Sequence, residues 1–277
     1  MSDATVMFSF GQNWSNFVDR ALSDDRIAIA RKQTTDFLGT ASLQGKSFLD
    51  IGCGSGLFSY VAHSLGAERV VSFDLDPRSV ACCQILRQRA GSPNNWAVEH
   101  GSILDEAFLA TIEPADVVYS WGVLHHTGQL WAAIANASRF AKPGGLVFIA
   151  IYNKLEYNAF RTWRGSHGWL RLKRFYNRAG SLGKRVLELI LASKDVALWV
   201  VTLRNPWREA RKYRENRGMS WWYDIVDWLG GYPYEFASAG EVFEYCHREL
   251  GFQLERMKTT SSIGCHQFLF RRPQLAS

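Results

Sequence analysis

Residues 49–56 read Leu-Asp-Ile-Gly-Cys-Gly-Ser-Gly, and residues 70–77 read Val-Val-Ser-Phe-Asp-Leu-Asp-Pro. In the first stretch, an apolar run ends in an acid and three alternating glycines. The second ends another apolar run with Asp74, eighteen residues beyond Gly56. An acid about twenty residues after a glycine-rich strand-to-helix turn is the spacing of a nucleotide site, in which the second carboxylate binds the ribose hydroxyls. The spacing therefore predicts a nucleotide-containing cofactor.

Two departures from the dinucleotide-binding pattern narrow the choice of cofactor. That pattern has a third glycine one position further on, where this chain has Leu57, and it places a pyrophosphate at a helix N-terminus. Here Asp50 stands in the turn. Its carboxylate would repel a pyrophosphate but could accept hydrogen bonds from a ligand that carries an ammonium and a sulfonium. S-adenosylmethionine is such a ligand.

These blocks resemble those of the class I S-adenosylmethionine-dependent methyltransferases, in particular small-molecule, quinone-biosynthesis-like methyltransferase domains. The family signature is acid-hydrophobe-Gly-x-Gly-x-Gly, followed by an acid that ends the second strand. The resemblance extends over residues 46–151 and returns weakly at 238–272. It implies S-adenosylmethionine as the cofactor, bound by Asp50, Gly52, Gly54, Gly56, Asp74 and Leu75.

The apolar patterning alternates strands with helices. We predict strands at 47–51, 69–73, 96–100, 115–120 and 146–152, and helices at 57–65, 78–89 and 130–140. A turn at 142–145 precedes the fifth strand, and a helix at 239–249 with strands at 253–259 and 266–271 closes the chain. This alternation predicts an α/β, doubly wound, Rossmann-like parallel sheet. The resemblance implies that the last strand pair completes a seven-stranded, mostly parallel sheet.

The predicted elements divide the chain into three parts. Residues 1–45 are expected to form an N-terminal helical lid, since residues 8–17 are rich in aromatic side chains. Residues 46–152 and 238–277 form the cofactor-binding core. Residues 153–237 form a helical insert after strand five, which we interpret as an acceptor cap.

The chemistry is expected at the end of strand four, because the carboxyl ends of parallel strands face one crevice. The sequence there is Ser-Trp-Gly-Val-Leu-His-His, residues 120–126. It resembles the segment that leaves strand four beneath the methyl group in small-molecule methyltransferases. Compared with plant-type O-methyltransferases, the resemblance places His125 at the position of the base and His126 in place of an acid. An imidazole suits proton removal from a hydroxyl at neutral pH.

Neighbouring segments supply further candidate contacts. Family members carry an acid after strand three that binds the adenine amino group, and this chain has Ser102 and Ile103 there. Ser120 and Trp121 are further cofactor candidates, and Asp76 is expected to cap a helix ahead of Pro77. The sequence lacks the Asn/Asp-Pro-Pro-aromatic segment of exocyclic-amine methyltransferases, which argues against that class. It also lacks the Asp-Asp-Asn metal ligands of catechol-type enzymes, so no metal is expected. Candidate acceptor-binding residues are Trp14, Tyr152, Asn153 and Tyr234.

The insert has a distinctive composition. Residues 154–217 contain sixteen Lys and Arg against five Asp and Glu, a net charge of +11, whereas the whole chain has +6. Seven of the eleven tryptophans lie within 153–237. The apolar spacing is helical, which indicates an amphipathic unit whose tryptophans pack. The charge also suits an anionic partner, namely an acidic substrate, an anionic membrane face or RNA.

The function that accounts best for these features is methyl transfer from S-adenosylmethionine to a small-molecule acceptor, with oxygen as the favoured atom and His125 as a base. Two alternatives stay open. One is a tRNA-modifying carboxymethyltransferase, because residues 120–126 also resemble a segment of the bacterial enzymes that modify wobble uridine. The other is a peripheral-membrane methyltransferase of a lipid or quinone precursor. Neither the acceptor nor the oligomeric state follows from the sequence.

The composition indicates the size of the fold and the compartment in which this chemistry is expected. The chain has 277 residues, of which 47% are hydrophobic, enough for one large domain with an elaboration. No apolar run reaches the ~18 uncharged residues of a membrane span. The five cysteines form no ligand pair, which fits reduced thiols and a cytoplasmic location.

Overall fold

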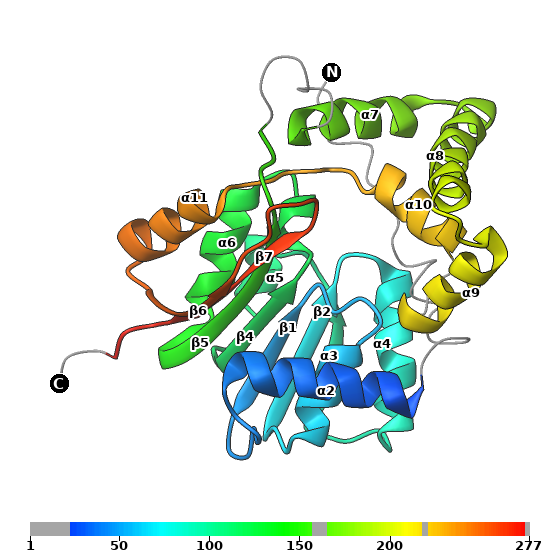
Figure 1. The fold of residues 1–277 in the computed structure, drawn as a ribbon. Helices are drawn as coiled ribbons and strands as arrows, with labels where there is room; N and C mark the ends of the chain where they lie inside the picture. Colours follow the sequence, from blue (N-terminus) through cyan, green and yellow to red (C-terminus); the bar gives the residue numbers. More distant parts are fainter. Residues whose placement is uncertain (1–22, 157–164, 218–220, 275–277) are drawn as a thin grey trace.

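The computed structural model describes residues 23–156, 165–217 and 221–274. At its centre lies a seven-stranded sheet in the order β3-β2-β1-β4-β5-β7-β6 (Figure 1). Strands β1 to β5 pair in parallel, whereas β7 is antiparallel to both β5 and β6. The predicted sheet is confirmed. Its strands are β1 (Ser47–Ile51), β2 (Arg69–Asp74), β3 (Trp96–His100), β4 (Ala115–Trp121), β5 (Ala141–Tyr152), β6 (Gln253–Lys258) and β7 (Cys265–Arg271).

Helices cover both faces of the sheet, and side chains alternate between two hydrophobic cores. On β1, Leu49 and Ile51 belong to one core and Phe48 to the other, as the two-residue period of a strand requires. The first core is closed by α6 (Leu130–Arg139) and α11 (Ala239–Glu244). The second is closed by α2 (Asp24–Leu38), α3 (Leu57–Ser64) and α4 (Pro77–Arg89).

Most predicted helices have the expected bounds within a few residues. Asp76 caps α4, accepting a hydrogen bond from the Arg78 N–H, and Pro77 occupies the first helical position as predicted. The predicted helix at 239–249 is α11 followed by a π-helical turn, Tyr245–Glu249. A short helix, α5 (Glu106–Leu109), and a 3₁₀ turn, Leu124–His126, were not expected.

The predicted N-terminal lid is described in part. Its described portion forms α2, which packs against α3 through residues of the second core. Residues 1–22, including Trp14 and the aromatic stretch 8–17, lie outside the described residues. The lid therefore stays a prediction.

The predicted turn at 142–145 lies inside β5, which begins at Ala141 rather than at Leu146. Ala115 pairs with Ala141 and Val117 with Leu146, so the four residues between them bulge out of the ladder. Gly145 permits this bulge, because a Cβ there would lie 2.8 Å from the Lys142 carbonyl oxygen.

Within its described residues, the insert after β5 forms four helices, which lie beside the sheet (Figure 1). They are α7 (Ser166–Arg178), α8 (Ser181–Val201), α9 (Pro206–Arg217) and α10 (Trp221–Gly230). Tyr176, Ala192, Ile225 and Leu229 form a small core of their own. The chain returns at Ala237, whose backbone forms a bridge with Asn153 and whose N–H donates to the Tyr152 carbonyl at 3.0 Å.

Candidate active site

The glycine-rich turn lies at the carboxyl end of β1, between the ends of β2 and β4. Backbone N–H groups of Gly52 and Cys53 donate to the Phe73 carbonyl at 2.8 and 3.0 Å. The Gly54 N–H donates to Asp74 Oδ2 at 3.0 Å. The sequence-predicted turn and the second acid are therefore tied together directly.

Two of the glycines are required by close approaches as well as by backbone conformation. Gly52 has φ +70°, and a Cβ there would lie 2.3 Å from the Val123 side chain. Gly56 has φ +81°, and its Cβ would lie 2.8 Å from the Cys83 Cα. The turn thus fits closely between the loop after β4 and helix α4, where no side chain other than hydrogen is accommodated.

Asp50 is buried beside the turn at the end of a hydrogen-bonded chain. The Trp96 indole N–H donates to the Ser72 hydroxyl (2.9 Å), which donates to the Ser59 hydroxyl (2.7 Å), which donates to Asp50 Oδ2 (2.5 Å). Burial raises the pKa of Asp50 to about 7, the Ser59 hydroxyl opposes that shift, and the charge of Asp74 adds to it.

The chemistry of this donor set fits S-adenosylmethionine. A buried carboxyl whose ionised form is disfavoured by burial gains from a cationic neighbour, and the cofactor carries an ammonium and a sulfonium. Asp74 is half-buried and also accepts from the Asp76 N–H at 2.9 Å, which leaves lone pairs for hydroxyl donors. Leu75 and Trp121, both 45% exposed, present apolar surface at the ends of β2 and β4. We name Asp50, Gly54, Asp74 and Leu75 as the residues that would hold the cofactor.

The remaining predicted cofactor contacts have structural hydrogen bonds. Ser102 accepts from the Leu104 N–H at 3.1 Å, and Ile103 is buried with its carbonyl bonded to Asn136 at 2.9 Å. Ser120 is fully buried and donates to the Ile51 carbonyl at 3.0 Å, which joins β4 to β1. These bonds fix the crevice wall, and the proposed ligand contacts of these residues remain predictions.

His125 is fully buried in the 3₁₀ turn after β4. The Tyr152 N–H lies 3.3 Å from its Nδ1, and the ring also forms a hydrogen bond with the Ala150 backbone. Its Nε2 is one of the buried polar atoms without a hydrogen-bond partner in the described part of the chain. Burial, reinforced by His126 and Lys173, lowers the pKa of His125 well below its usual value, and the Ala150 hydrogen bond opposes that shift. The imidazole is therefore neutral, and its Nδ1 is engaged by the backbone of β5.

His126 is half-buried, and a backbone carbonyl fixes its tautomer. Its Nδ1 lies 2.6 Å from the Pro233 carbonyl oxygen, which can only accept, so Nδ1 carries the proton and Nε2 the lone pair. Burial lowers the pKa of His126 to about 4, the charge of Lys173 adds to that shift, and the Pro233 carbonyl opposes it. In this tautomer, His126 has the ring lone pair that a proton acceptor needs.

An aromatic cluster packs against the histidine pair. The Tyr152 ring lies 3.9 Å from His125, 5.2 Å from Tyr234 and 5.9 Å from Trp228, measured between ring centroids. Lys173 of α7 is buried, with its ammonium 4.3 Å from the Trp228 ring and 4.9 Å from the Tyr234 ring. The structure thus brings predicted acceptor residues Tyr152 and Tyr234 next to the histidines, with a cation from the insert among them.

Asn153 belongs to the same region but is used by the fold. Its amide N–H groups donate to the carbonyls of Thr260 and Ser262 at 3.0 and 3.1 Å, and its Oδ1 lies 2.8 Å from His266 Nε2. These bonds fix the loop between β6 and β7, so the amide has little capacity left for an acceptor.

Glu235 follows Tyr234 in a segment whose phenol and carboxylate groups the sequence offers to an acceptor, but its structural role was not expected. Its N–H donates to the His125 carbonyl at 2.9 Å, and its Oε1 accepts from the Leu130 N–H at 3.1 Å at the start of α6. Its Oε2 is buried without a hydrogen-bond partner among the described residues, and burial raises its pKa. A side-chain cap supplied from 105 positions away carries no local sequence signal.

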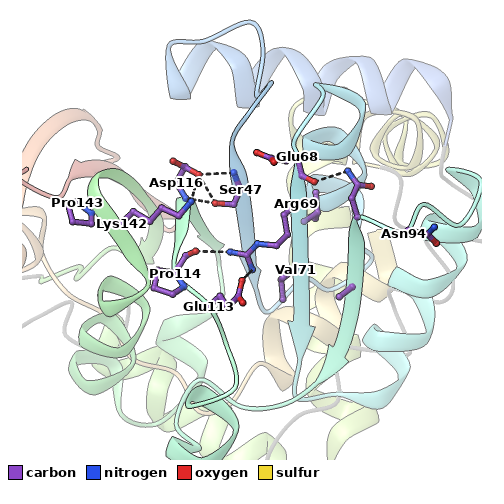
Figure 2. A pocket seen from close by; sticks show the side chains of 13 residues that line it. Ser47, Glu68, Arg69, Val71, Asn94, Glu113, Pro114, Asp116, Lys142 and Pro143 are labelled. Atoms are coloured by element: carbon purple, nitrogen blue, oxygen red, sulfur yellow. Dashed lines mark hydrogen bonds and ion pairs between the residues drawn. The ribbon is translucent and has the colours of Figure 1, made fainter.

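A hollow at the opposite edge of the sheet is not part of this site. It is lined by residues at the amino ends of the strands, including Ser47, Arg69 and Asp116 (Figure 2). Asp116 accepts from the Ser47 hydroxyl at 2.6 Å and pairs with Lys142 at 2.9 Å, while Arg69 pairs with Glu113 at 3.3 Å. Its charges compensate one another, so we interpret this edge as structural.

Comparison with known proteins was consistent with this geometry. The family model described as a methyltransferase domain matches residues 23–189. The ubiquinone biosynthesis O-methyltransferase of Methylobacterium sp. strain 4-46 is 30% identical over 155 residues, 52% of this chain and 60% of that protein. The corresponding protein of Paraburkholderia phytofirmans is 33% identical over 147 residues, 48% of this chain and 61% of that protein. The chain therefore spans less than two thirds of the length of these curated relatives.

Solved structures share the fold at low sequence identity. The magnesium protoporphyrin IX methyltransferase from Synechocystis PCC 6803, with bound SAH, has a TM-score of 0.53 and 15% identity, covering 94% of this chain and 93% of that one. An O-methyltransferase family protein from Burkholderia thailandensis has a TM-score of 0.50 and 13% identity, covering 91% and 56%. These likenesses concern the arrangement of the elements.

Proposed function

Because this chain belongs to the methyltransferase domain family and is an S-adenosylmethionine-dependent methyltransferase, we propose that it methylates a hydroxyl oxygen of a small aromatic acceptor. The observation that carries this proposal is the tautomer of His126, whose lone-pair nitrogen follows from the Pro233 hydrogen bond. The O-methyltransferase identity of the curated relatives supports the choice of oxygen.

The chain's own residues then have distinct roles. When bound, the cofactor supplies an electrophilic methyl group that an oxygen nucleophile takes by in-line displacement. His126 Nε2 accepts the hydroxyl proton as the oxygen attacks, and the Pro233 carbonyl stabilises the imidazolium that forms through its Nδ1–H bond. His125, with its Nδ1 engaged by the backbone of β5, positions the loop instead of acting as the base. Much of the acceleration comes from holding the acceptor in line.

The aromatic cluster is the proposed acceptor-binding surface. Tyr152, Trp228 and Tyr234 offer ring surfaces beside the histidines, and the charge of Lys173 acts on both histidines. An aromatic acceptor with an anionic substituent matches these features.

Two tryptophans of the insert are used in packing against each other. The rings of Trp199 and Trp221 have centroids 5.0 Å apart. Single-stranded RNA is bound through exposed stacking rings, so this packing favours a small acceptor over tRNA.

The test replaces His126 and measures methyl transfer. We expect His126→Gln to lower kcat by roughly a hundredfold or more, because the variant lacks the proton acceptor. The affinity for S-adenosylmethionine, measured by calorimetry, should stay within about threefold, since the cofactor is held elsewhere. On the acid side, the wild-type rate should hold down to about pH 5 and fall toward pH 4, where the His126 imidazole takes up a proton.

His247→Gln is the matched control, because His247 Nδ1 also lies near a backbone carbonyl, that of Phe252 at 2.9 Å, remote from the crevice. Methyl-labelled cofactor would be supplied with phenols, catechols, enols and carboxylic acids, and with small-molecule, lipid and RNA fractions of a cell extract. Full turnover by His126→Gln, or label entering only RNA, would overturn the proposal.

A further inference from the structure

Helix α8 has two unlike faces. Leu187, Leu191 and Ala192 pack on the small core between α7 and α10. The two acids of the helix also point to that side, because Glu188 accepts from the Tyr176 hydroxyl at 2.8 Å and Asp195 from the Trp221 indole at 3.1 Å. The inner face thus contains the acidic groups of α8.

The outer face of α8 has exposed apolar side chains toward both ends of the helix. At about 100° per residue, Leu182, Val186, Leu189 and Ile190 fall on the same side as Val200 and Val201, with the smaller Ser193 and Ala197 exposed between the two groups. The stripe continues past the helix into the start of α9, where Leu203 and Trp207 are 96% and 87% exposed. We call this surface the α8 stripe; its exposed apolar residues are Leu182, Val186, Leu189, Ile190, Val200, Val201, Leu203 and Trp207.

Cationic side chains border the α8 stripe. At about 100° per residue, Arg185 and Lys194 fall on its opposite edges, and both are exposed. Each also pairs with an acid of the helix, Arg185 with Glu188 at 3.2 Å and Lys194 with Asp195 at 3.7 Å. Arg204 and Arg208 extend the positive charge beyond the helix and are exposed as well. Apolar side chains bordered by cations are the pattern of a helix that lies in the plane of an anionic lipid surface.

The position of α8 leaves this surface accessible. The helix lies at the outer edge of the molecule, away from the sheet (Figure 1). Within the part of the chain that the structure describes, no helix is long and apolar enough to cross a membrane. Contact with lipid would therefore be parallel to the surface, through the stripe.

We propose that the α8 stripe docks this protein on the surface of an anionic lipid bilayer. The apolar side chains enter the headgroup boundary, and the flanking cations pair with lipid phosphates. A second copy of this chain could also cover the stripe. Such pairing would bring Arg185 and Lys194 of each copy close to like charges, which disfavours a dimer through this surface. The proposal does not depend on which acceptor is methylated.

The test uses the full chain in vesicle co-sedimentation. We expect binding to vesicles of phosphatidylcholine with about one third phosphatidylglycerol to exceed binding to pure phosphatidylcholine by roughly tenfold or more, and to weaken with salt. The double variant Leu189→Glu/Val200→Glu should lose this binding, because it places two carboxylates in the stripe.

Ile29→Glu/Ile85→Glu is the matched control. Ile29 and Ile85 lie on α2 and α4, are 57% and 47% exposed, and their replacement changes the net charge by the same amount. This control should sediment as the wild type does, and both variants should keep their affinity for S-adenosylmethionine. Equal loss in both variants, no sedimentation of the wild type, or a dimer that only Leu189→Glu/Val200→Glu dissociates would overturn the proposal.

Discussion

The two acids of the cofactor crevice have different environments although each ends or nears the end of a parallel strand. Asp50 is buried at the end of the chain of hydroxyls from Trp96. Asp74 is half-buried and receives two backbone N–H groups, from Gly54 and Asp76. The protonation of Asp50 is therefore sensitive to nearby charge, whereas the carboxylate of Asp74 also holds the backbone of the turn in place.

Replacement of Asp74 should abolish cofactor binding. Asp74→Ala removes the carboxylate proposed to bind the ribose and frees the Gly54 N–H, so we expect the Kd for S-adenosylmethionine to rise by roughly a hundredfold or more. Calorimetry measures this directly. Asp76→Ala is the control, because it removes a helix cap worth about 1 kcal/mol of stability and leaves the turn in place. Equal affinities for Asp74→Ala and the wild type would contradict the assignment.

The histidine pair shows which features of the site the sequence did not predict. The sequence pointed to His125 and His126 together, and the hydrogen bonding of each ring depends on a backbone group from a distant segment, the Tyr152 N–H or the Pro233 carbonyl. Glu235 reaches α6 in the same way. Because such partners are brought together by the fold, the residue types were predictable and their roles were not.

At the scale of elements, the glycine-rich turn combines a left-handed backbone with close packing. A Cβ added at Gly52 would meet Val123, and one at Gly56 would meet Cys83. Gly91 has φ +85°, and a Cβ added there would have no atom of the described residues within 4 Å. Substitutions at these three glycines therefore distinguish the free-energy cost of a left-handed backbone from the cost of a steric clash.

Alanine substitutions at these glycines should rank in stability. Gly91→Ala should cost about 1 to 2 kcal/mol, the penalty of the left-handed conformation. Gly52→Ala and Gly56→Ala should each cost about 1 to 3 kcal/mol more, from overpacking. Urea unfolding of the purified variants measures these differences.

A second substitution distinguishes the two contacts. Val123→Ala should restore part of the loss in Gly52→Ala, because the clash there is with a side chain. Cys83→Ala should restore little in Gly56→Ala, since the Cys83 Cα lies 2.8 Å from the added Cβ. Equal costs at all three glycines would show that packing around the turn is loose.

Periodicity predicted the regular elements well, and failures have local causes. Strand β1, which is buried along its whole length, matched its expected bounds, because an apolar run between turns marks it clearly. The start of β5 was missed because the Pro-Gly-Gly sequence at 143–145 is typical of a turn, and here it forms a bulge inside the strand. The helices of the insert were expected as a group, but their faces depend on mutual packing.

At the scale of the whole molecule, the sheet and the helical array differ in how much apolar surface they bury. The sheet is enclosed between two large cores, whereas the small core of the array contains four buried residues among those whose burial the structure describes. Elements with few buried contacts open locally at a lower free energy than that of unfolding the whole molecule.

Hydrogen exchange should therefore separate the two parts. We expect amides of α8 to exchange at least roughly a hundredfold faster than amides of β1 and β4, as measured by mass spectrometry of peptides. Anionic vesicles should slow exchange in α8 specifically if the stripe binds lipid. Uniform exchange over both parts would mean that the array unfolds together with the sheet.

The bridge between Asn153 and Ala237 bears on how such an enzyme could diversify. The insert leaves and re-enters the core at one point, where the Lys154 N–H also donates to the Ala237 carbonyl at 3.1 Å. Helical segments of other lengths could be joined at these two ends with little added loop-closure entropy. Recombination in nature, or grafting in the laboratory, can thus exchange the helical unit that we propose to face the acceptor and leave the part of the molecule with the glycine-rich turn unaltered.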